Sequence, residues 1–346
     1  MNILVIGGTR FLGRQLVWRL LARGDRVTLL NRGQIANPFP ALFDDRIERL
    51  VGDRTRGDLA RLVGARRFDA VVDMCAYTAP DAQSALDAVG GRTGHYVFIS
   101  TGQVYLVRTN LHGPAREEDY AGPTMEAPAA EPDLGEWRYG MDKRAAEGVL
   151  AHAHANIGFP ATLLRLPMVH GVGDYYRRVE AYLWRLLDGG PLLLPESADR
   201  PMRHVSAPAA SAAIAALLGN PHTFGRAFNL AQDETPTLRE FVQTLAGIVG
   251  TTANLVIASP EERERANLAA GDLSPLSGRW MSFIDPSRAR SELGFVHEPV
   301  REYLAAIVSD FQNHPPHAPP SGYARRSEEV ALAERLLNQH APRATL

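Results

Sequence analysis

The chain has 346 residues, of which 45% are hydrophobic and 22% charged, and its formal net charge is -2. This composition is typical of a globular protein with a large core and excludes a disordered chain. The balanced charge argues against nucleic acid as a partner. A single cysteine, Cys75, excludes an internal disulfide and favours a cytoplasmic location, and no apolar run is long enough to cross a membrane.

Short apolar runs alternate with amphipathic stretches, which is the pattern of parallel strands covered by helices on both faces. Leu12, Leu16 and Leu20 share one face of the first predicted helix, which ends at Gly24. The pattern predicts an α/β fold with a parallel sheet that is covered on both faces, and a smaller second lobe from the C-terminal half. The predicted strands cover residues 2–6, 26–30, 47–51, 69–74, 96–100, 161–167 and 226–231.

The predicted domains are discontinuous in sequence, because the late strand at residues 226–231 is expected to return to the first sheet. We predict a dinucleotide-binding domain from residues 1–168 and 201–232. Residues 169–200 and 233–320, richer in aromatic, proline and polar residues, form the predicted substrate-binding lobe. We expect residues 321–346 to form a helical tail that packs on the body or on another subunit, and a homodimer is the expected assembly in the second case.

A glycine-rich sequence, GGTRFLG, directly follows the first strand and opens the first helix. At this position glycines allow a tight turn and close helix packing, while the helix N-terminus offers N–H groups to a pyrophosphate. The sequence therefore predicts a dinucleotide cofactor. The predicted contacts are Gly7, Gly8, Thr9, Arg10, Phe11, Leu12 and Gly13.

The second strand ends in Asn31 and Arg32, where NAD sites usually carry a carboxylate for the ribose 2'-hydroxyl. Arg10 of the glycine loop reaches toward the same end of the cofactor. Two guanidinium groups suit a 2'-phosphate, so we predict NADP, with NAD as the alternative if both arginines are solvated or stack on adenine. Asp53, after the third strand, is a candidate acceptor for the adenine amino group.

Lys143 is the only lysine among the 37 Lys and Arg residues, and it follows Tyr139 by four positions. On a helix this spacing puts both side chains on one face. A nearby ammonium favours the phenolate form of a tyrosine, and it can also bind the hydroxyl groups of a nicotinamide ribose. The pair is therefore a candidate general acid/base.

Several motifs occur in a familiar order along the chain. They are GGTRFLG (7–13), YVFISTGQVY (96–105), YGMDKRAAE (139–147), LLRLPMVHG (163–171), RPMRHVSAPAAS (200–211), FNLAQDETPTLRE (228–240) and DPSRARSELGF (285–295). Together they resemble the extended short-chain dehydrogenase/reductase family, also called the NAD-dependent epimerase/dehydratase family. The resemblance covers residues 1 to about 310.

The resemblance implies a Rossmann-type doubly wound parallel sheet with a smaller C-terminal substrate-binding lobe. It also implies a nicotinamide cofactor and a catalytic group of Thr101, Tyr139 and Lys143. Thr101 would bind the substrate oxygen, Tyr139 would exchange a proton with it, and the nicotinamide would exchange a hydride with the adjacent carbon. Ser100 and Pro167 would lie on the cofactor side.

The family's dehydratases and decarboxylases carry carboxylates directly after the catalytic threonine, whereas this chain has Gly102 and Gln103. An amide cannot shuttle a proton, so these two reactions are not expected by that route. Met168 replaces the asparagine that meets a substrate pyrophosphate in many members, although Arg200 matches the family's phosphate-reaching arginine. The expected substrate contacts are therefore Thr101, Gln103, Met168 and Arg200.

These observations predict an NADP-preferring oxidoreductase that interconverts a secondary alcohol and a ketone on a sugar-like or nucleotide-linked small molecule. One alternative is an epimerase with tightly bound cofactor. Another alternative is a non-catalytic, dinucleotide-dependent RNA-binding or regulatory protein. It follows from the sequence GGTRF, which resembles the corresponding motif of chloroplast stem-loop-binding proteins. No metal site is expected, because the eleven histidines show no ligand spacing.

Overall fold

The computed structural model describes residues 1–36, 38–276 and 278–340, and the chain divides into two compact units. Unit 1 comprises Met1–Val169, His204–Asp233 and Ser282–His297. Unit 2 comprises His170–Arg203, Glu234–Met281 and Glu298–Leu346. The assignment of unit 1 to the dinucleotide and unit 2 to the substrate remains a prediction.

One segment lies in a different unit from the one its composition indicated. Residues 282–297 fall within the range predicted for the substrate-binding lobe, but their contacts place them in unit 1. The backbone explains the placement, because the N–H of Ala115 donates to the carbonyl of Phe283 and the N–H of Asp285 donates to the carbonyl of Ala115.

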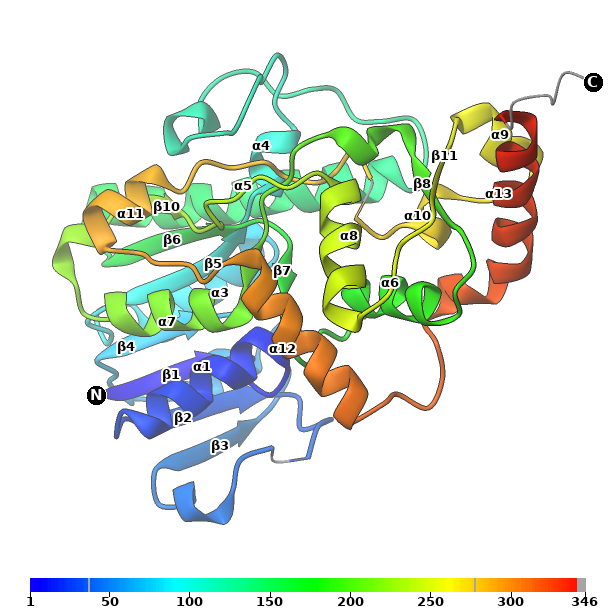
Figure 1. The fold of residues 1–346 in the computed structure, drawn as a ribbon. Coiled ribbons are helices and arrows are strands. Elements are labelled where there is room, and N and C mark those ends of the chain that lie inside the picture. Colours follow the sequence, from blue (N-terminus) through cyan, green and yellow to red (C-terminus); the bar gives the residue numbers. More distant parts are fainter. Residues whose placement is uncertain (37, 277, 341–346) are drawn as a thin grey trace, which may run out of the picture. The chain divides into compact units, whose positions relative to one another are not determined.

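Unit 1 is built on a seven-stranded sheet whose strand pairs are all parallel (Figure 1). The order is β10-β6-β5-β4-β1-β2-β3, so the direction of strand addition reverses between β1 and β4. This confirms the predicted Rossmann-type class. The strands are β1 (Asn2–Ile6), β2 (Arg26–Asn31), β3 (Ile47–Val51), β4 (Ala70–Asp73), β5 (Tyr96–Thr101), β6 (Ala161–Leu166) and β10 (Arg226–Asn229).

Helices cover both faces of this sheet and form a separate hydrophobic core on each. One core includes α1 (Phe11–Ala22), α7 (Ala207–Leu217) and α11 (Ser287–Leu293), and Figure 1 shows α1 and α7 side by side. The other core contains α2 (Asp58–Val63), α3 (Ala79–Val89) and α5 (Asp133–Ile157). The short helix α4 (Gln103–Leu106) packs against α5.

Local sequence explains where several of these helices begin. Thr78 accepts from the N–H of Asp81, whose carboxylate accepts in return from the N–H of Thr78, and together they form a capping box for α3. Ser206 caps α7 in a similar way through the N–H of Ala209. The two-residue strands β7 (Val169–His170) and β9 (Val205–Ser206) lie near points where the chain passes between the units.

Unit 2 combines helices with one small parallel pair of strands. The strands are β8 (Leu192–Pro195) and β11 (Leu255–Ala258). The helices are α6 (Arg178–Leu187), α8 (Leu238–Val249), α9 (Pro260–Arg265), α10 (Ala270–Leu273), α12 (Val300–Asn313) and α13 (Arg326–His340). Leucines of α13 complete a core with residues of both strands, so the C-terminal helix belongs to the body of unit 2.

A buried ionic network attaches α13 to the rest of unit 2. Glu329, which is 0% exposed, accepts from Nε of Arg185 at 2.8 Å and from Nη1 of Arg326 at 2.9 Å. Arg326 also pairs with Asp188 at 2.7 Å, at the end of α6. Because these charges are withdrawn from water, each depends on its partners for compensation.

Replacing Glu329 with alanine should therefore destabilise the protein by about 3–5 kcal/mol, since the guanidinium of Arg185 is left buried without its carboxylate. Urea unfolding measures this change. The neighbouring Glu328→Ala is the control, because Glu328 pairs with Arg325 at the surface. A Glu329→Ala protein with the same unfolding midpoint as the control would show that the network does not anchor the helix.

Candidate active site

Most candidate residues of unit 1 lie along one edge of the sheet, the edge formed by the carboxyl ends of its parallel strands. Parallel strands end at the same edge, and the glycine loop, Arg32, Asp53, Thr101 and Pro167 all lie at or just after strand ends. Open α/β sheets bind ligands outside the carboxyl ends of the strands, at the point where the strand order reverses. In this sheet the order reverses between β1 and β4. Arg200 belongs to unit 2, where it is exposed at the end of a short 3-10 helix.

The glycine loop has the close contacts that a pyrophosphate cradle needs. Gly7 has a φ of +86°, and a Cβ there would lie 3.1 Å from Sγ of Cys75. A Cβ on Gly13 would lie 2.8 Å from Cα of Gly8, so larger residues would push α1 away from the loop. The loop and the N-terminus of α1 therefore fit a dinucleotide pyrophosphate. Gly8 and Leu12 are buried, whereas Thr9 and Phe11 are half-buried.

The residues predicted to bind the adenosine end of the cofactor follow the ends of β1, β2 and β3. Arg10 and Arg32 are exposed, and Oδ1 of Asn31 accepts from the N–H of Gly33 at 2.8 Å. Asp53 accepts from both the N–H and the hydroxyl of Thr55, and these hydrogen bonds lower the pKa of Asp53. Asp53 therefore caps the 3-10 turn that follows β3, while its predicted contact with adenine remains untested.

Lys143 is almost completely buried, with 3% of its surface exposed. Its Nζ donates to the carbonyl of Ala76 at 2.7 Å, after β4, and to that of Ile99 at 2.8 Å, in β5. The ammonium also lies 5.0 Å from the ring centroid of Tyr77 and 4.7 Å from that of Phe98. Burial lowers the pKa of Lys143 to about 8.

Tyr139 lies one turn before Lys143 on α5 and is half-buried. Its ring centroid is 6.4 Å from that of Tyr77. The Tyr77 ring also lies near the Lys143 ammonium, so it is a neighbour of both residues. Thr101 ends β5, and its hydroxyl oxygen accepts from the N–H of Gln103 at 3.2 Å. The helix and the strand end thus present the three predicted catalytic residues at the same sheet edge.

A buried network behind these residues was not anticipated from the sequence. The hydroxyl of Ser100 donates to Glu147 at 2.5 Å, and Glu147 forms a two-point ion pair with Arg165 at 3.0 and 2.6 Å. Nη1 of Arg165 in turn donates to the hydroxyl of Tyr105 at 2.8 Å. Glu147 follows Lys143 by four residues on α5, and this spacing was the signal that could have revealed it.

A second buried ion pair fixes the turn that carries Ala76. Both carboxylate oxygens of Asp73 accept from Nη1 of Arg54, at 2.7 and 2.8 Å, and Asp73 also accepts from the N–H of Cys75 at 3.1 Å. The hydroxyl of Tyr96 donates to the same carboxylate at 2.7 Å. Burial raises the pKa of the Cys75 thiol to about 11, so the thiol is neutral near pH 7.

The residues predicted to meet the substrate have varied surroundings. Gln103 is buried, and its amide donates to the carboxylate of Glu136 at 2.9 Å, a partner that the sequence did not suggest. Met168 is half-buried, and its carbonyl accepts from the N–H of Val205 at 3.0 Å. Pro167, beside it, is buried.

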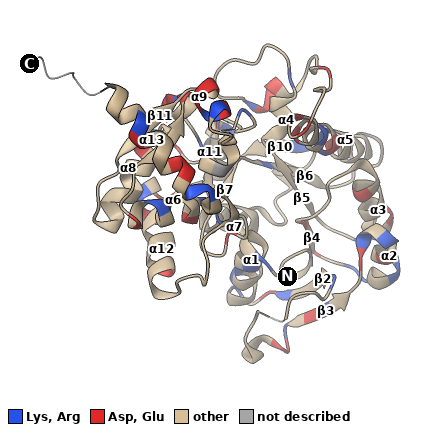
Figure 2. Ribbon diagram, turned by 90° about the vertical axis from the view of Figure 1, so that its right-hand side faces the viewer, with Lys and Arg blue, Asp and Glu red and all other residues tan. Residues whose placement is uncertain are grey.

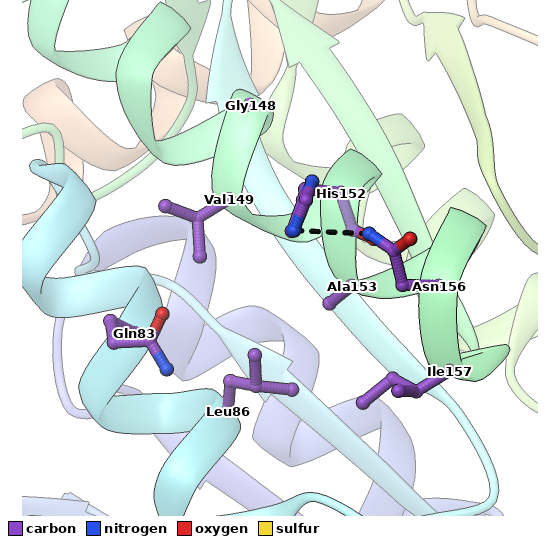
Figure 3. Close-up of a pocket in the computed structure, with 8 residues that line it drawn as sticks. All are labelled: Gln83, Leu86, Gly148, Val149, His152, Ala153, Asn156 and Ile157. Carbon is purple, nitrogen blue, oxygen red and sulfur yellow. Dashed lines mark hydrogen bonds between the residues drawn. The ribbon is translucent and has the colours of Figure 1, made fainter.

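A hollow of about 430 Å³ lies on the outer side of unit 1, between α3 and α5 (Figure 3). Leu86 of α3 faces Val149, Ala153 and Ile157 of α5, and His152 hydrogen-bonds Asn156 along the rim. Its mainly apolar lining contains none of the predicted site residues.

In residues 1–36, 38–276 and 278–340 there is no group of three or more His, Cys, Asp or Glu residues placed to hold a metal ion. No described helix is both long and apolar enough to traverse a bilayer.

Known proteins match this chain over most of its length. The family model for the NAD dependent epimerase/dehydratase family matches residues 3–231. A 2'-dehydrokanamycin reductase from Streptomyces kanamyceticus is 29% identical over 290 residues, which cover 82% of this chain and 77% of the reductase. The 41 kDa chloroplast stem-loop binding protein b of Arabidopsis thaliana is 28% identical over 246 residues, covering 68% of this chain and 60% of that protein.

Solved structures share the fold at lower identity. A dTDP-glucose 4,6-dehydratase from Bacillus anthracis, in complex with NAD, superposes with a TM-score of 0.70 at 17% identity. The match covers 91% of this chain and 97% of the dehydratase. At this identity the likeness concerns the fold alone.

The buried ammonium makes a prediction about stability. The pKa of Lys143 falls from 10.5 in the unfolded chain to about 8 when folded, so between these values the unfolded chain binds more protons. Relative to Lys143→Met, the wild-type protein should therefore gain up to roughly 3 kcal/mol of unfolding free energy between pH 8 and pH 10.5. Urea unfolding of both proteins across this range measures the difference. Parallel pH profiles would mean that Lys143 is not desolvated.

Proposed function

The chain belongs to the NAD dependent epimerase/dehydratase family, and we propose that it interconverts a secondary alcohol and a ketone on a sugar-like or nucleotide-linked small molecule. The observation that carries this proposal is the arrangement on α5. Tyr139 precedes the buried Lys143 by one turn, and the Lys143 ammonium is held at the sheet edge by carbonyls near the ends of β4 and β5.

In the proposed reaction each residue has one task. The hydroxyls of Thr101 and Tyr139 bind the substrate oxygen, and Tyr139 gives or takes the proton that this oxygen exchanges. Lys143 favours the phenolate of Tyr139 by its positive charge and is available to the hydroxyls of the cofactor ribose. The nicotinamide, when bound, supplies or accepts the hydride.

The direction and outcome of the redox step separate two versions of this proposal. A relative named as a 2'-dehydrokanamycin reductase supports net reduction of a ketone by a dissociable cofactor. The alternative is an epimerase that keeps its cofactor and returns the hydride to the opposite face of a transient ketone. Stoichiometric nicotinamide in the purified protein, with no net cofactor turnover, would favour the epimerase.

We further propose that the cofactor is NADP rather than NAD. The exposed guanidinium groups of Arg10 and Arg32 support this choice, as does the absence of a carboxylate from position 31. Nevertheless, the dehydratase with a similar fold was solved with NAD. A 2'-phosphate would bring about two negative charges to these arginines, which NAD lacks.

Assembly and location complete the proposal. We propose a homodimer and a cytoplasmic location. Sedimentation of the purified protein tests the first, and fractionation of its native cells tests the second. Figure 2 shows acidic and basic residues interspersed on the ribbons of both units, which gives little support to the RNA-binding alternative.

Tyr139→Phe should lose at least about a hundredfold in turnover, because the proton exchange requires the phenol oxygen. Nicotinamide binding should persist, since the ring remains in place. Steady-state kinetics and a cofactor titration measure the two effects. An unchanged rate would remove Tyr139 from the chemistry, and tight binding of stem-loop RNA at physiological salt, unaffected by the substitution, would favour the RNA-binding alternative.

Arg32→Ala should weaken NADP binding about tenfold while leaving NAD binding nearly unchanged, because only NADP carries the 2'-phosphate. Dissociation constants for both cofactors test this expectation. Arg14→Ala is the matched control, since Arg14 is an exposed arginine within α1. Equal losses for the two cofactors would contradict the proposed phosphate contact.

A further inference from the structure

An exposed aromatic ring lies beside both residues of the proposed acid/base pair. Tyr77 comes shortly after β4 and keeps 49% of its surface exposed. The centroid of its ring lies 6.4 Å from that of Tyr139 and 5.0 Å from Nζ of Lys143. Tyr77 is therefore a common neighbour of the two side chains, although no sequence motif pointed to it.

Hydrogen bonds fix the turn that carries Tyr77. Its N–H donates to Oδ2 of Asp81 at 2.9 Å, and the same carboxylate completes the capping box of α3. Arg54 holds Asp81 in turn, because Nη2 of Arg54 donates to the Asp81 carbonyl at 2.7 Å. The carbonyl of the preceding residue, Ala76, accepts from Nζ of Lys143. The turn that presents the Tyr77 ring is thus in place before any ligand arrives.

Contact with the lysine accounts for only part of the position of Tyr77. Single exposed aromatic residues are common on protein surfaces and indicate nothing by themselves. The ring does contribute to the surroundings of the Lys143 ammonium, as the ring of Phe98 does at 4.7 Å. Phe98 is completely buried, however, whereas about half of Tyr77 is exposed beside the same ammonium. A ligand that reaches this ammonium would meet the exposed part of Tyr77.

The proposed chemistry brings a cofactor to this place. Lys143 is expected to bind the ribose hydroxyls next to the nicotinamide, and Tyr139 is expected to lie beside the reacting atoms. An acceptor bonded to Nζ of Lys143 lies about 2.9 Å from it. The Tyr77 ring centroid is 5.0 Å from the same nitrogen. A nicotinamide riboside held by Lys143 therefore lies within reach of the Tyr77 ring.

We propose that Tyr77 is a cofactor-binding residue whose ring packs against the nicotinamide riboside half of the dinucleotide. This inference rests on the proposed function and adds a contact that neither the motifs nor the family resemblance indicated. Aromatic rings bury a large area and pack well against other flat rings, so the ring rather than the hydroxyl makes the contact. The contact concerns one half of the cofactor only, because the glycine loop and Arg32 are predicted to hold the other half.

Binding of two matched ligands tests this contact without any substrate. NADP contains the nicotinamide riboside, whereas 2',5'-ADP is the adenosine end alone. By calorimetry, Tyr77→Ala should bind NADP about tenfold more weakly than the wild-type protein, as expected for the loss of one aromatic contact, and should bind 2',5'-ADP with unchanged affinity. Tyr77→Phe should match the wild type for both ligands. For a protein that prefers NAD, the pair NAD and ADP takes their place.

Tyr176→Ala is the matched control, because Tyr176 is a tyrosine of unit 2 that is 61% exposed. This variant should bind both ligands as the wild type does. Unchanged NADP affinity in Tyr77→Ala would overturn the inference. Equal losses for NADP and 2',5'-ADP would also overturn it, since the nicotinamide half would then not be responsible. So would a loss in Tyr77→Phe as large as in Tyr77→Ala, because the hydroxyl would then make the contact.

Lys143→Met separates failure of this inference from failure of the proposed function. If the nicotinamide binds beside α5, this variant weakens NADP binding but not 2',5'-ADP binding, whatever the result for Tyr77→Ala. A loss of NADP affinity confined to Lys143→Met would therefore overturn the Tyr77 contact alone. Unchanged NADP affinity in both variants would overturn the contact and the proposed function together, because the nicotinamide would then not reach α5.

Discussion

The candidate site depends on how a single buried ammonium is kept charged. Nζ of Lys143 has two neutral carbonyl partners, from Ala76 and Ile99, and lies close to two aromatic rings. Burying an ammonium is costly unless its surroundings compensate, and burial does lower its pKa. Asp73 and Glu147 oppose that shift by their negative charge. The lysine thus remains a cation near neutral pH without a direct ion pair.

The two ion pairs behind the lysine explain why its acceptors are in place. Asp73 and Arg54 fix the turn after β4 that presents the Ala76 carbonyl. Glu147 and Arg165 join α5 to β6, and the Ser100 hydroxyl joins the same carboxylate to β5 next to Ile99. Both carbonyls are therefore held by structure rather than by the lysine itself. Such preorganised surroundings reduce the reorganisation needed during a reaction.

The sequence predicted the parts of this arrangement that follow local rules. Apolar runs revealed the seven strands, the glycine loop followed from its place between strand and helix, and a four-residue spacing joined Tyr139 to Lys143. Glu147 follows Lys143 at the same four-residue spacing on α5. The sequence also predicted the C-terminal helix. It did not predict that this helix packs on unit 2, because that packing depends on the contact between Glu329 and the distant Arg185.

Contacts between distant segments could not be predicted in this way. Arg54 meets Asp73 across 19 residues, Gln103 meets Glu136 across 33, and Ala115 meets the segment around Phe283 across a much longer separation. Each depends on the strand order β10-β6-β5-β4-β1-β2-β3 and on loop paths that composition does not encode. For the same reason the sequence did not indicate that residues 282–297 belong to unit 1, although it correctly predicted the fold class.

The most direct test of this account is a crystal structure of the protein with NADP bound. The account predicts that Nζ of Lys143 lies within hydrogen-bonding distance of the nicotinamide ribose hydroxyls, with the Tyr139 hydroxyl beside the nicotinamide ring. A nicotinamide bound far from α5, with Lys143 still occupied only by the carbonyls of Ala76 and Ile99, would contradict it.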